Sequence, residues 1–151
     1  MLETKVNEKT KEFFKVMGYD VETEINYEKD ENLLEINVIN LEDAKILIGR
    51  QGSVLSCIQL LLRRILKKEL EKDVYIFLDI DNYKKNKVNS YKSIANSAAE
   101  EVITTMQEKV LPPLSSFARR IIHLELAKRD DVLTESIGEG DQRRLVVKPK
   151  L

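Results

Sequence analysis

Cysteine and histidine are almost absent from this sequence of 151 residues, which has one of each. A single cysteine excludes an intramolecular disulfide and a cysteine metal cluster. A single histidine excludes any site that needs several imidazole groups. Cys57 stands among apolar residues with helical spacing, so we expect it to be a small core residue.

Long hydrophobic runs are absent as well. No apolar stretch approaches the roughly 20 residues needed to cross a membrane, and no secretory signal opens the sequence. Hydrophobic residues at 42% and charged residues at 34% are typical of an ordinary folded protein. We therefore expect one domain or two small ones, without membrane insertion.

The net charge is close to zero, but the two signs are separated along the chain. Residues 1–43 carry five Lys or Arg against twelve Asp or Glu, a balance of −7. Residues 44–151 carry 20 against 14, a balance of +6. Solvated surfaces of opposite sign would explain this pattern without a ligand. It also favours an anionic partner for the later part of the chain.

Glycine is scarce, yet two of the five glycines stand three apart in Gly49-Arg50-Gln51-Gly52. We predict a sharp turn there between two helices, with the second helix starting at Gly52 or Ser53. Its unpaired N–H groups and the charge of Arg50 would form a receptor for a sugar-phosphate backbone. A tight turn without a ligand is the alternative for so short a motif. The helix that follows repeats apolar residues three or four apart: Val54, Leu55, Ile58, Leu61, Leu62, Ile65 and Leu66.

Helical spacing and strand alternation predict six elements up to residue 80. They are a helix (3–17), two strands (21–27 and 34–39), a short helix ending at Gly49, a long helix to about Lys68 and a strand (73–80). This α-β-β-α-α-β order, with the Gly-x-x-Gly turn between the fourth and fifth elements, resembles the type II KH domain. The resemblance implies that the turn holds the backbone of about four single-stranded nucleotides.

The remainder of the chain predicts a second set of elements. They are a lysine-rich helix (82–109), a helix from Phe117 to about Lys128 and two strands (132–136 and 143–148). Pro112-Pro113 must end the first helix, and Ser115 or Ser116 can cap the second. The second helix is expected to bury one apolar row: Phe117, Ile121 and Leu124. We place the domain boundary near residue 83, which divides the chain into residues 1–83 and 84–151.

Arg119 and His123 stand four apart, so they project from the same side of the predicted helix. Such a pair of donors can hold phosphate oxygens, although a surface arginine and a boundary histidine would show the same spacing. The segment Arg119-Arg120-Ile121-Ile122-His123, ahead of a hairpin with Arg143-Arg144, resembles the R-three-H domain, named for its Arg-x-x-x-His. A type II KH domain followed by an R-three-H domain is similar to the Jag (SpoIIIJ-associated) family of bacterial cytoplasmic RNA-binding proteins.

This resemblance implies both a fold and a function. The fold would be α+β, with a type II KH domain joined by a long helix to a small α/β R-three-H domain. The function would be non-catalytic binding of single-stranded RNA, with single-stranded DNA as another ligand, in the regulation of gene expression or envelope growth. A small KH protein would be a partner. The implied nucleic-acid-binding residues are Gly49, Arg50, Gln51, Gly52, Ser53, Arg119, His123, Arg143 and Arg144.

The sequence departs from that family in two places. Many members begin with a small extra domain and a charged linker, so we expect this sequence to be a fragment or a short member, and we carry over no role of that domain. The turn at residues 136–141 also differs from the family's serine-glutamate-glycine stretch.

Two other classes of function are open to this sequence. A protein-interaction adaptor with the same folds is the main alternative. A nuclease or ATPase is disfavoured, because the sequence has no Walker-type loop and no second histidine. The acidic pairs Asp79/Asp81 and Asp130/Asp131 stand at strand or helix ends, where capping is expected. We therefore predict no catalytic residue, metal or cofactor.

Overall fold

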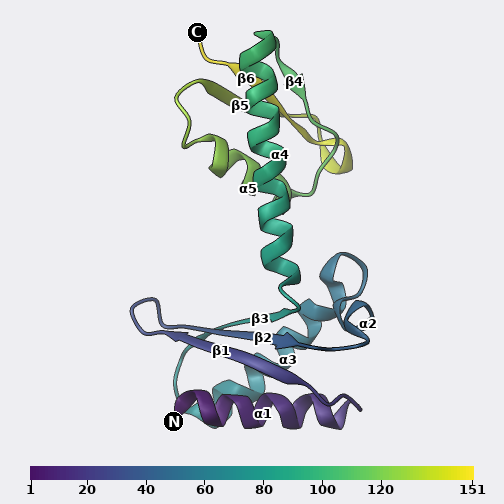
Figure 1. Cartoon of the computed structure of the whole chain (residues 1–151), viewed down its shortest axis with the longest axis vertical. Helices are drawn as coiled ribbons and strands as arrows, with labels where there is room; N and C mark the ends of the chain where they lie inside the picture. The colour runs from purple at the N-terminus through teal and green to yellow at the C-terminus, as the bar shows by residue number, and fades with distance from the viewer. The chain divides into compact units, whose positions relative to one another are not determined.

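The computed structural model describes all 151 residues, and its contacts divide the chain into two units, Met1–Lys85 and Asn86–Leu151 (Figure 1). The division falls inside α4, the helix that spans Tyr83–Thr105. Each unit combines helices with a three-stranded sheet, so the chain has the predicted α+β class. None of the helices has both the length and the apolar character that a membrane span requires.

Unit 1 has the α-β-β-α-α-β order predicted from the sequence. Its elements are α1 (Leu2–Val16), β1 (Glu22–Glu28), β2 (Leu33–Ile39), α2 (Ala44–Ile48), the 3₁₀ turn η1 (Arg50–Gly52), α3 (Ser53–Leu70) and β3 (Tyr75–Ile80). β1 pairs with β2 in antiparallel and β2 pairs with β3 in parallel, so β3 is an edge strand. Parallel strands need a long crossover, and α2, the turn and α3 supply it.

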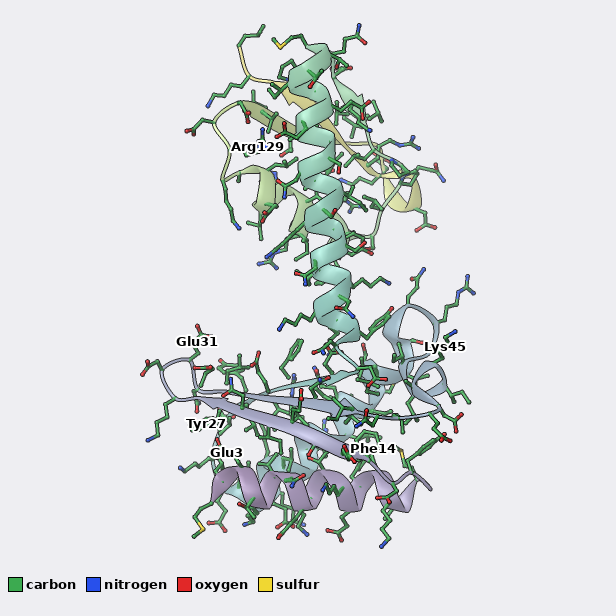
Figure 2. All side chains as sticks on the ribbon, viewed as in Figure 1. Glu3, Phe14, Tyr27, Glu31, Lys45 and Arg129 are labelled. Carbon is green, nitrogen blue, oxygen red and sulfur yellow. The ribbon has the colours of Figure 1, made fainter.

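One apolar row from each main element builds the core of unit 1. Leu34, Ile36 and Val38 alternate along β2 and are all buried, as the pleat of a strand requires. Phe14 points from α1 toward the sheet (Figure 2) and is fully buried. α3 buries Leu55, Ile58, Leu62 and Leu66. Figure 1 shows α1 and α3 on the same side of this sheet, so the helices of the core leave its other face uncovered.

Unit 2 packs helices on a second sheet. After α4 come β4 (Lys109–Val110), α5 (Ser116–Leu126), β5 (Val132–Ile137), the 3₁₀ turn η2 (Gly140–Gln142) and β6 (Arg144–Pro149). The strand order is β4-β6-β5, and both pairings are antiparallel. Ser115 caps α5 by accepting the backbone N–H of Ala118 at 3.2 Å, as predicted. The core of unit 2 joins α4, α5 and the sheet through Ala95, Ala98, Ala99, Val102, Leu111, Ile122, Leu126, Val132, Leu145 and Val147.

The helix predicted over residues 82–109 was too long at its end. α4 stops at Thr105, and Met106 adopts a left-handed φ of 54°. Lys109–Val110 then forms β4 by pairing with Val146 and Val147 of β6. A two-residue strand has no periodic signal of its own, and its partner lies far along the chain, so the sequence pattern could not reveal it.

Two predictions about buried residues were wrong. Cys57 is exposed on α3. Phe117 and Leu124 are exposed on α5, where Ala118, Ile122 and Leu126 are buried instead. On α5 the two rows are both apolar and both have helical spacing, so spacing alone could not decide which one faces the core.

Candidate nucleic-acid interface

The Gly-x-x-Gly stretch forms the turn between α2 and α3. Gly49 has φ 73° and ψ −176°, a conformation that is essentially restricted to glycine. A Cβ added at Gly49 would lie 2.4 Å from Cγ2 of Val54 and 2.9 Å from the backbone nitrogen of Val54. Arg50 and Gln51 are exposed at the tip. The fold therefore requires glycine at position 49 and presents the two central side chains to solvent.

The N-terminus of α3 is open beside this turn. α3 begins at Ser53, runs for 18 residues, and has neither a side-chain cap nor an acidic residue in its first turn. The N–H groups of Gly52 and Ser53 donate to the carbonyls of Gly49 and Arg50 in the 3₁₀ turn, and the helix dipole gives this end a partial positive charge. Together with the exposed guanidinium of Arg50, this charge attracts an anion such as a phosphate.

Tyr83 supports the turn, and the sequence did not point to it. Its ring carbon Cε1 lies 3.1 Å from the position that a Cβ on Gly52 would take. Gly52 is buried and has a left-handed φ of 79°, so a side chain there would meet both backbone strain and the tyrosine ring. The two residues are far apart in sequence, and no motif links them.

Side chains of α3 cover the free edge of β3. The amide oxygen of Gln59 accepts the backbone N–H of Leu78 at 2.9 Å and the Nζ of Lys84 at 2.6 Å. Arg63 donates to a backbone carbonyl of the same strand at 3.3 Å. The Nζ of Lys84 also lies 4.7 Å from the ring centroid of Phe77. Partial burial lowers the pKa of Lys84, so this lysine is part of the packing beside the edge strand.

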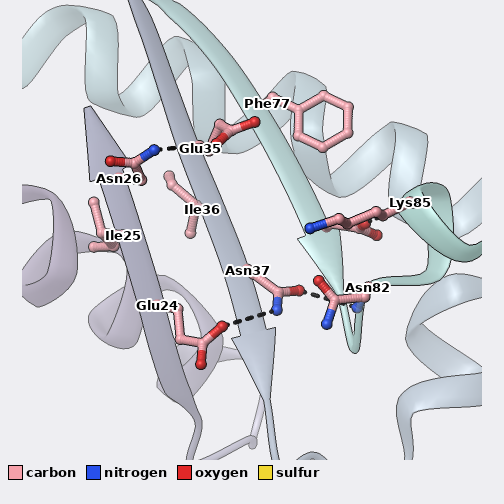
Figure 3. A pocket seen from close by; sticks show the side chains of 10 residues that line it. Glu24, Ile25, Asn26, Glu35, Ile36, Asn37, Phe77, Asn82 and Lys85 are labelled. Carbon is pink, nitrogen blue, oxygen red and sulfur yellow. Dashed lines mark hydrogen bonds between the residues drawn. The ribbon is translucent and has the colours of Figure 1, made fainter. Parts of the chain in front are cut away.

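The uncovered face of the unit 1 sheet is acidic. It contains a depression of about 220 Å³, into which Glu24 projects from β1 and Glu35 from β2 (Figure 3). Amide side chains, Ile25, Ile36, Asp79 and the ring of Phe77 also line it, and Lys85 is its one basic residue against three acidic ones. The carboxylates of Glu24 and Glu35 would repel a phosphate backbone placed in this depression. The turn at Gly49–Gly52 is therefore the better receptor for an anionic ligand in unit 1.

One carboxylate of each acidic pair has a structural partner. The carboxylate of Asp79 accepts backbone N–H groups of Lys84 and Lys85 at 3.0 and 3.2 Å, so it caps α4. Asp131 accepts two hydrogen bonds from Arg129, at 2.8 and 2.7 Å, which lower the pKa of the Asp131 carboxyl. Arg129 is labelled in Figure 2 and also donates to Glu100 at 2.8 Å. No group of three or more His, Cys, Asp or Glu side chains is placed to hold a metal ion.

In unit 2, α5 and β5 bring three of the predicted residues together. Arg119 donates to the carbonyl of Arg143 at 3.4 Å, and at 2.5 Å to a carbonyl of the loop before α5. Nδ1 of His123 lies 2.5 Å from Oγ1 of Thr134, and Nε of Arg143 donates to Oγ of Ser136 at 2.7 Å. Thr134 and Ser136 are two apart on β5 and so face the same side. The result is a patch of two guanidinium groups, one imidazole and two hydroxyl groups, in which His123, Ser136 and Arg143 are exposed and Arg119 and Thr134 are half-buried.

Arg144 does not join this patch. Leu145 and Val147 point into the core of unit 2, so strand alternation directs Arg144 to the opposite face of the sheet. Its guanidinium contacts the backbone and side chain of Gln142, each at 3.3 Å. A ligand bound at Arg119 would therefore need to extend around the sheet edge to reach it.

The family model of the R-three-H domain matches residues 89–149. The chain contains an R-three-H domain. Within unit 2, the match extends from the first half of α4 to the end of β6. Arg119, His123, Arg143 and Arg144 all fall inside the R-three-H domain.

Three curated relatives share the name RNA-binding protein KhpB. The one from Clostridium symbiosum is 28% identical over 149 residues, which cover 99% of this chain and 67% of the relative. The one from Lactiplantibacillus plantarum is 34% identical over 111 residues, covering 72% of this chain and 34% of the relative. The one from Bacillus subtilis is 30% identical over 111 residues, covering 72% of this chain and 53% of the relative. The chain thus matches only part of each relative.

Proposed function

We propose that this chain binds single-stranded RNA and catalyses no reaction. The proposal rests on the turn at Gly49–Gly52. Gly49 has backbone angles that only glycine readily adopts, and the turn exposes Arg50 and Gln51 beside the N-terminus of α3, which no side chain caps. The names of the relatives support RNA as the nucleic acid. Single-stranded DNA would offer the same phosphates and is the ligand to compare.

In this proposal unit 1 is a type II KH domain, and the chain is a member of the Jag family with a cytoplasmic regulatory role. The element order and the position of the turn support the KH assignment. Phosphates would bind the side chains of Arg50 and Gln51 at the positive end of the α3 dipole, close to Gly49, Gly52 and Ser53. The acidic sheet face, with Glu24 and Glu35, would stay in solvent or meet a protein.

The R-three-H domain would supply the second contact. Arg119, His123 and Arg143 would bind phosphates of the same strand, and Arg144 would add a contact only for a strand that continues past the sheet edge. Because the two sites are linked, binding at one raises the effective concentration at the other. Two modest affinities can therefore combine into a tight complex with a longer RNA.

The direct test reverses the charge at the turn. Replacing Arg50 and Gln51 together with Asp puts two carboxylates where the phosphates are expected. We expect at least a tenfold loss of affinity for single-stranded RNA, about 1.4 kcal/mol, with little change in melting temperature since both side chains are exposed. The matched control replaces Lys11 and Thr4, two exposed residues of α1, with Asp. Both variants change the net charge by the same amount, so equal losses of affinity would contradict the proposed site.

A protein-interaction adaptor is the second candidate, and one observation favours it. α3 exposes a row of apolar side chains, Val54, Leu61 and Ile65, on a face that it does not bury. An exposed apolar row of this kind often marks a protein interface. Salt dependence separates the two candidates. Three to five phosphate contacts on single-stranded RNA predict a log–log slope of affinity against salt near −2 to −3.5, at about −0.7 per contact. A flat response would support the adaptor.

A further inference from the structure

The outer face of α5 carries a large aromatic residue that the core does not use. Phe117 is 52% exposed. The helix packs into unit 2 through Ala118, Ile122 and Leu126, which lie on its other side. The hydrophobic effect alone would favour burying a phenylalanine, so packing within the unit does not explain its place.

A second ring holds Phe117 in position. The rings of Tyr91 and Phe117 meet edge to face, with centroids 6.3 Å apart and planes at 71°. Tyr91 is itself half-buried against the core of unit 2. Phe117 is therefore an ordered aromatic surface, and little conformational entropy remains to be lost when a ligand binds it.

A cation lies beside Phe117 on the exposed side of α5. At 100° per residue, Arg120 lies on the exposed side of α5 between Phe117 and the patch formed by Arg119 and His123. The acidic residue in α5 is Glu125, whose carboxylate accepts a hydrogen bond from Lys128 at 2.9 Å. The hydrogen bond from Lys128 lowers the pKa of Glu125. The face thus joins an exposed ring to positive charge, the combination that single-stranded nucleic acids require.

We propose that Phe117, held by Tyr91, stacks on a nucleobase of a single-stranded RNA whose phosphates contact Arg119 and Arg120. This inference rests on the proposed RNA binding and adds a base contact to the phosphate contacts of the R-three-H domain. Stacking accepts any base, because every base has a π face. The subsite would therefore favour unpaired RNA over duplex RNA without selecting a particular sequence. A protein partner on this face would need neither bases nor phosphates.

The test compares two ligands on the full chain. One is a single-stranded oligoadenosine of about 20 nucleotides, long enough for several contacts of the size that a KH loop makes. The other is an abasic oligomer with the same number of phosphates. We expect Phe117→Ala to weaken oligoadenosine at least fivefold, the lower end of what stacking on one aromatic contributes. It should leave the abasic affinity and the salt slope unchanged. Arg120→Glu should weaken both ligands.

Two further variants separate a loss of stacking from a loss of stability or of exposed apolar surface. Phe117→Trp preserves a stacking ring and should bind like the parent even if the alanine variant is less stable. Leu133→Ala is the matched control, since Leu133 is 51% exposed in the same unit and its neighbour Thr134 is the one that contacts α5. It should not change RNA affinity.

The outcomes separate failure of RNA binding from failure of the base contact at Phe117. If the parent chain binds neither RNA, the proposed function itself fails. If the parent binds and Phe117→Ala binds oligoadenosine equally well, only the base subsite is refuted. Equal losses on oligoadenosine and on the abasic oligomer would also refute stacking, because such losses would show that Phe117 merely shapes the phosphate patch.

Discussion

Replacing Gly49 with alanine tests whether the turn between α2 and α3 has the conformation described above. The φ of 73° and ψ of −176° at Gly49 lie where a side chain is strongly disfavoured. The added methyl group would also approach Val54 to 2.4 Å at the side chain and 2.9 Å at the backbone nitrogen. Since the backbone at the start of α3 is one of the obstacles, a change of rotamer cannot relieve the clash.

Gly18 provides the matched control. It also has a positive φ, 93°, but nothing lies within 4 Å of the position that its Cβ would occupy. Alanine at Gly18 should therefore show only backbone strain, about 1–2 kcal/mol for a left-handed residue. At Gly49 we expect backbone strain of about 1–3 kcal/mol plus about 1–3 kcal/mol for forced packing. Where the backbone strain is similar at the two glycines, the variants should differ by the packing contribution, about 1–3 kcal/mol.

Urea unfolding of the full chain measures this difference, and thermal unfolding checks it. For a unit of this size, 1 kcal/mol corresponds to a shift in melting temperature of roughly 4–8 °C. RNA affinity should fall with Gly49→Ala and stay unchanged with Gly18→Ala, because Gly18 follows α1 and is not part of the turn at Gly49–Gly52. Equal losses of stability in the two variants would show that the contact with Val54 does not restrain the turn, and the reasoning would fail.

Three further predictions concern unit 2. Arg119→Glu should weaken long single-stranded RNA at least tenfold, about 1.4 kcal/mol, but hardly affect oligomers of about four nucleotides that fit the first turn alone. His123→Ala should cost less, because one net hydrogen bond contributes about 0.5–1.5 kcal/mol; titrations with short and long RNA check both, and length-independent losses would argue against a second site. The hydrogen bonds of Arg129 hold the pKa of the Asp131 carboxyl below its ordinary value, so the stability they add is complete at neutral pH and is lost as the pH falls through the lowered pKa. Asp131→Asn should therefore lower the urea midpoint more at pH 7 than in acid, and a loss that does not shrink as the pH falls would contradict this account.

Local pattern was enough to predict most elements of the chain. Alternation located β1 and β2, because successive side chains of a strand point to opposite faces whatever else the chain does. The two glycines located the turn at Gly49–Gly52, because few residues other than glycine adopt the backbone angles that Gly49 has. Ser115 was recognisable as a cap for the same local reason, since its hydroxyl bonds to a residue only three positions ahead.

Contacts between distant residues could not be predicted in this way. Tyr83 lies against Gly52, Gln59 bonds to the edge of β3, and Arg119 meets Arg143 only after the chain has folded back. β4 exists only because β6 pairs with it. In each case the partner is many residues away, and the sequence carries no periodic signal for the pairing.

The sequence determined where the helices α3 and α5 form, but only the tertiary structure decided which face of each helix is buried. The sequence determined that residues 53–70 and 116–126 are amphipathic helices, since apolar side chains recur every three or four residues. It offered two apolar rows on each helix, however, and a rotation of about 100° exchanges neighbouring rows. Only packing against the rest of each unit selected Ala118 over Phe117 and left Cys57 in solvent. The row of Ala118, Ile122 and Leu126 is buried, and Phe117 is therefore left exposed on the outer face of α5.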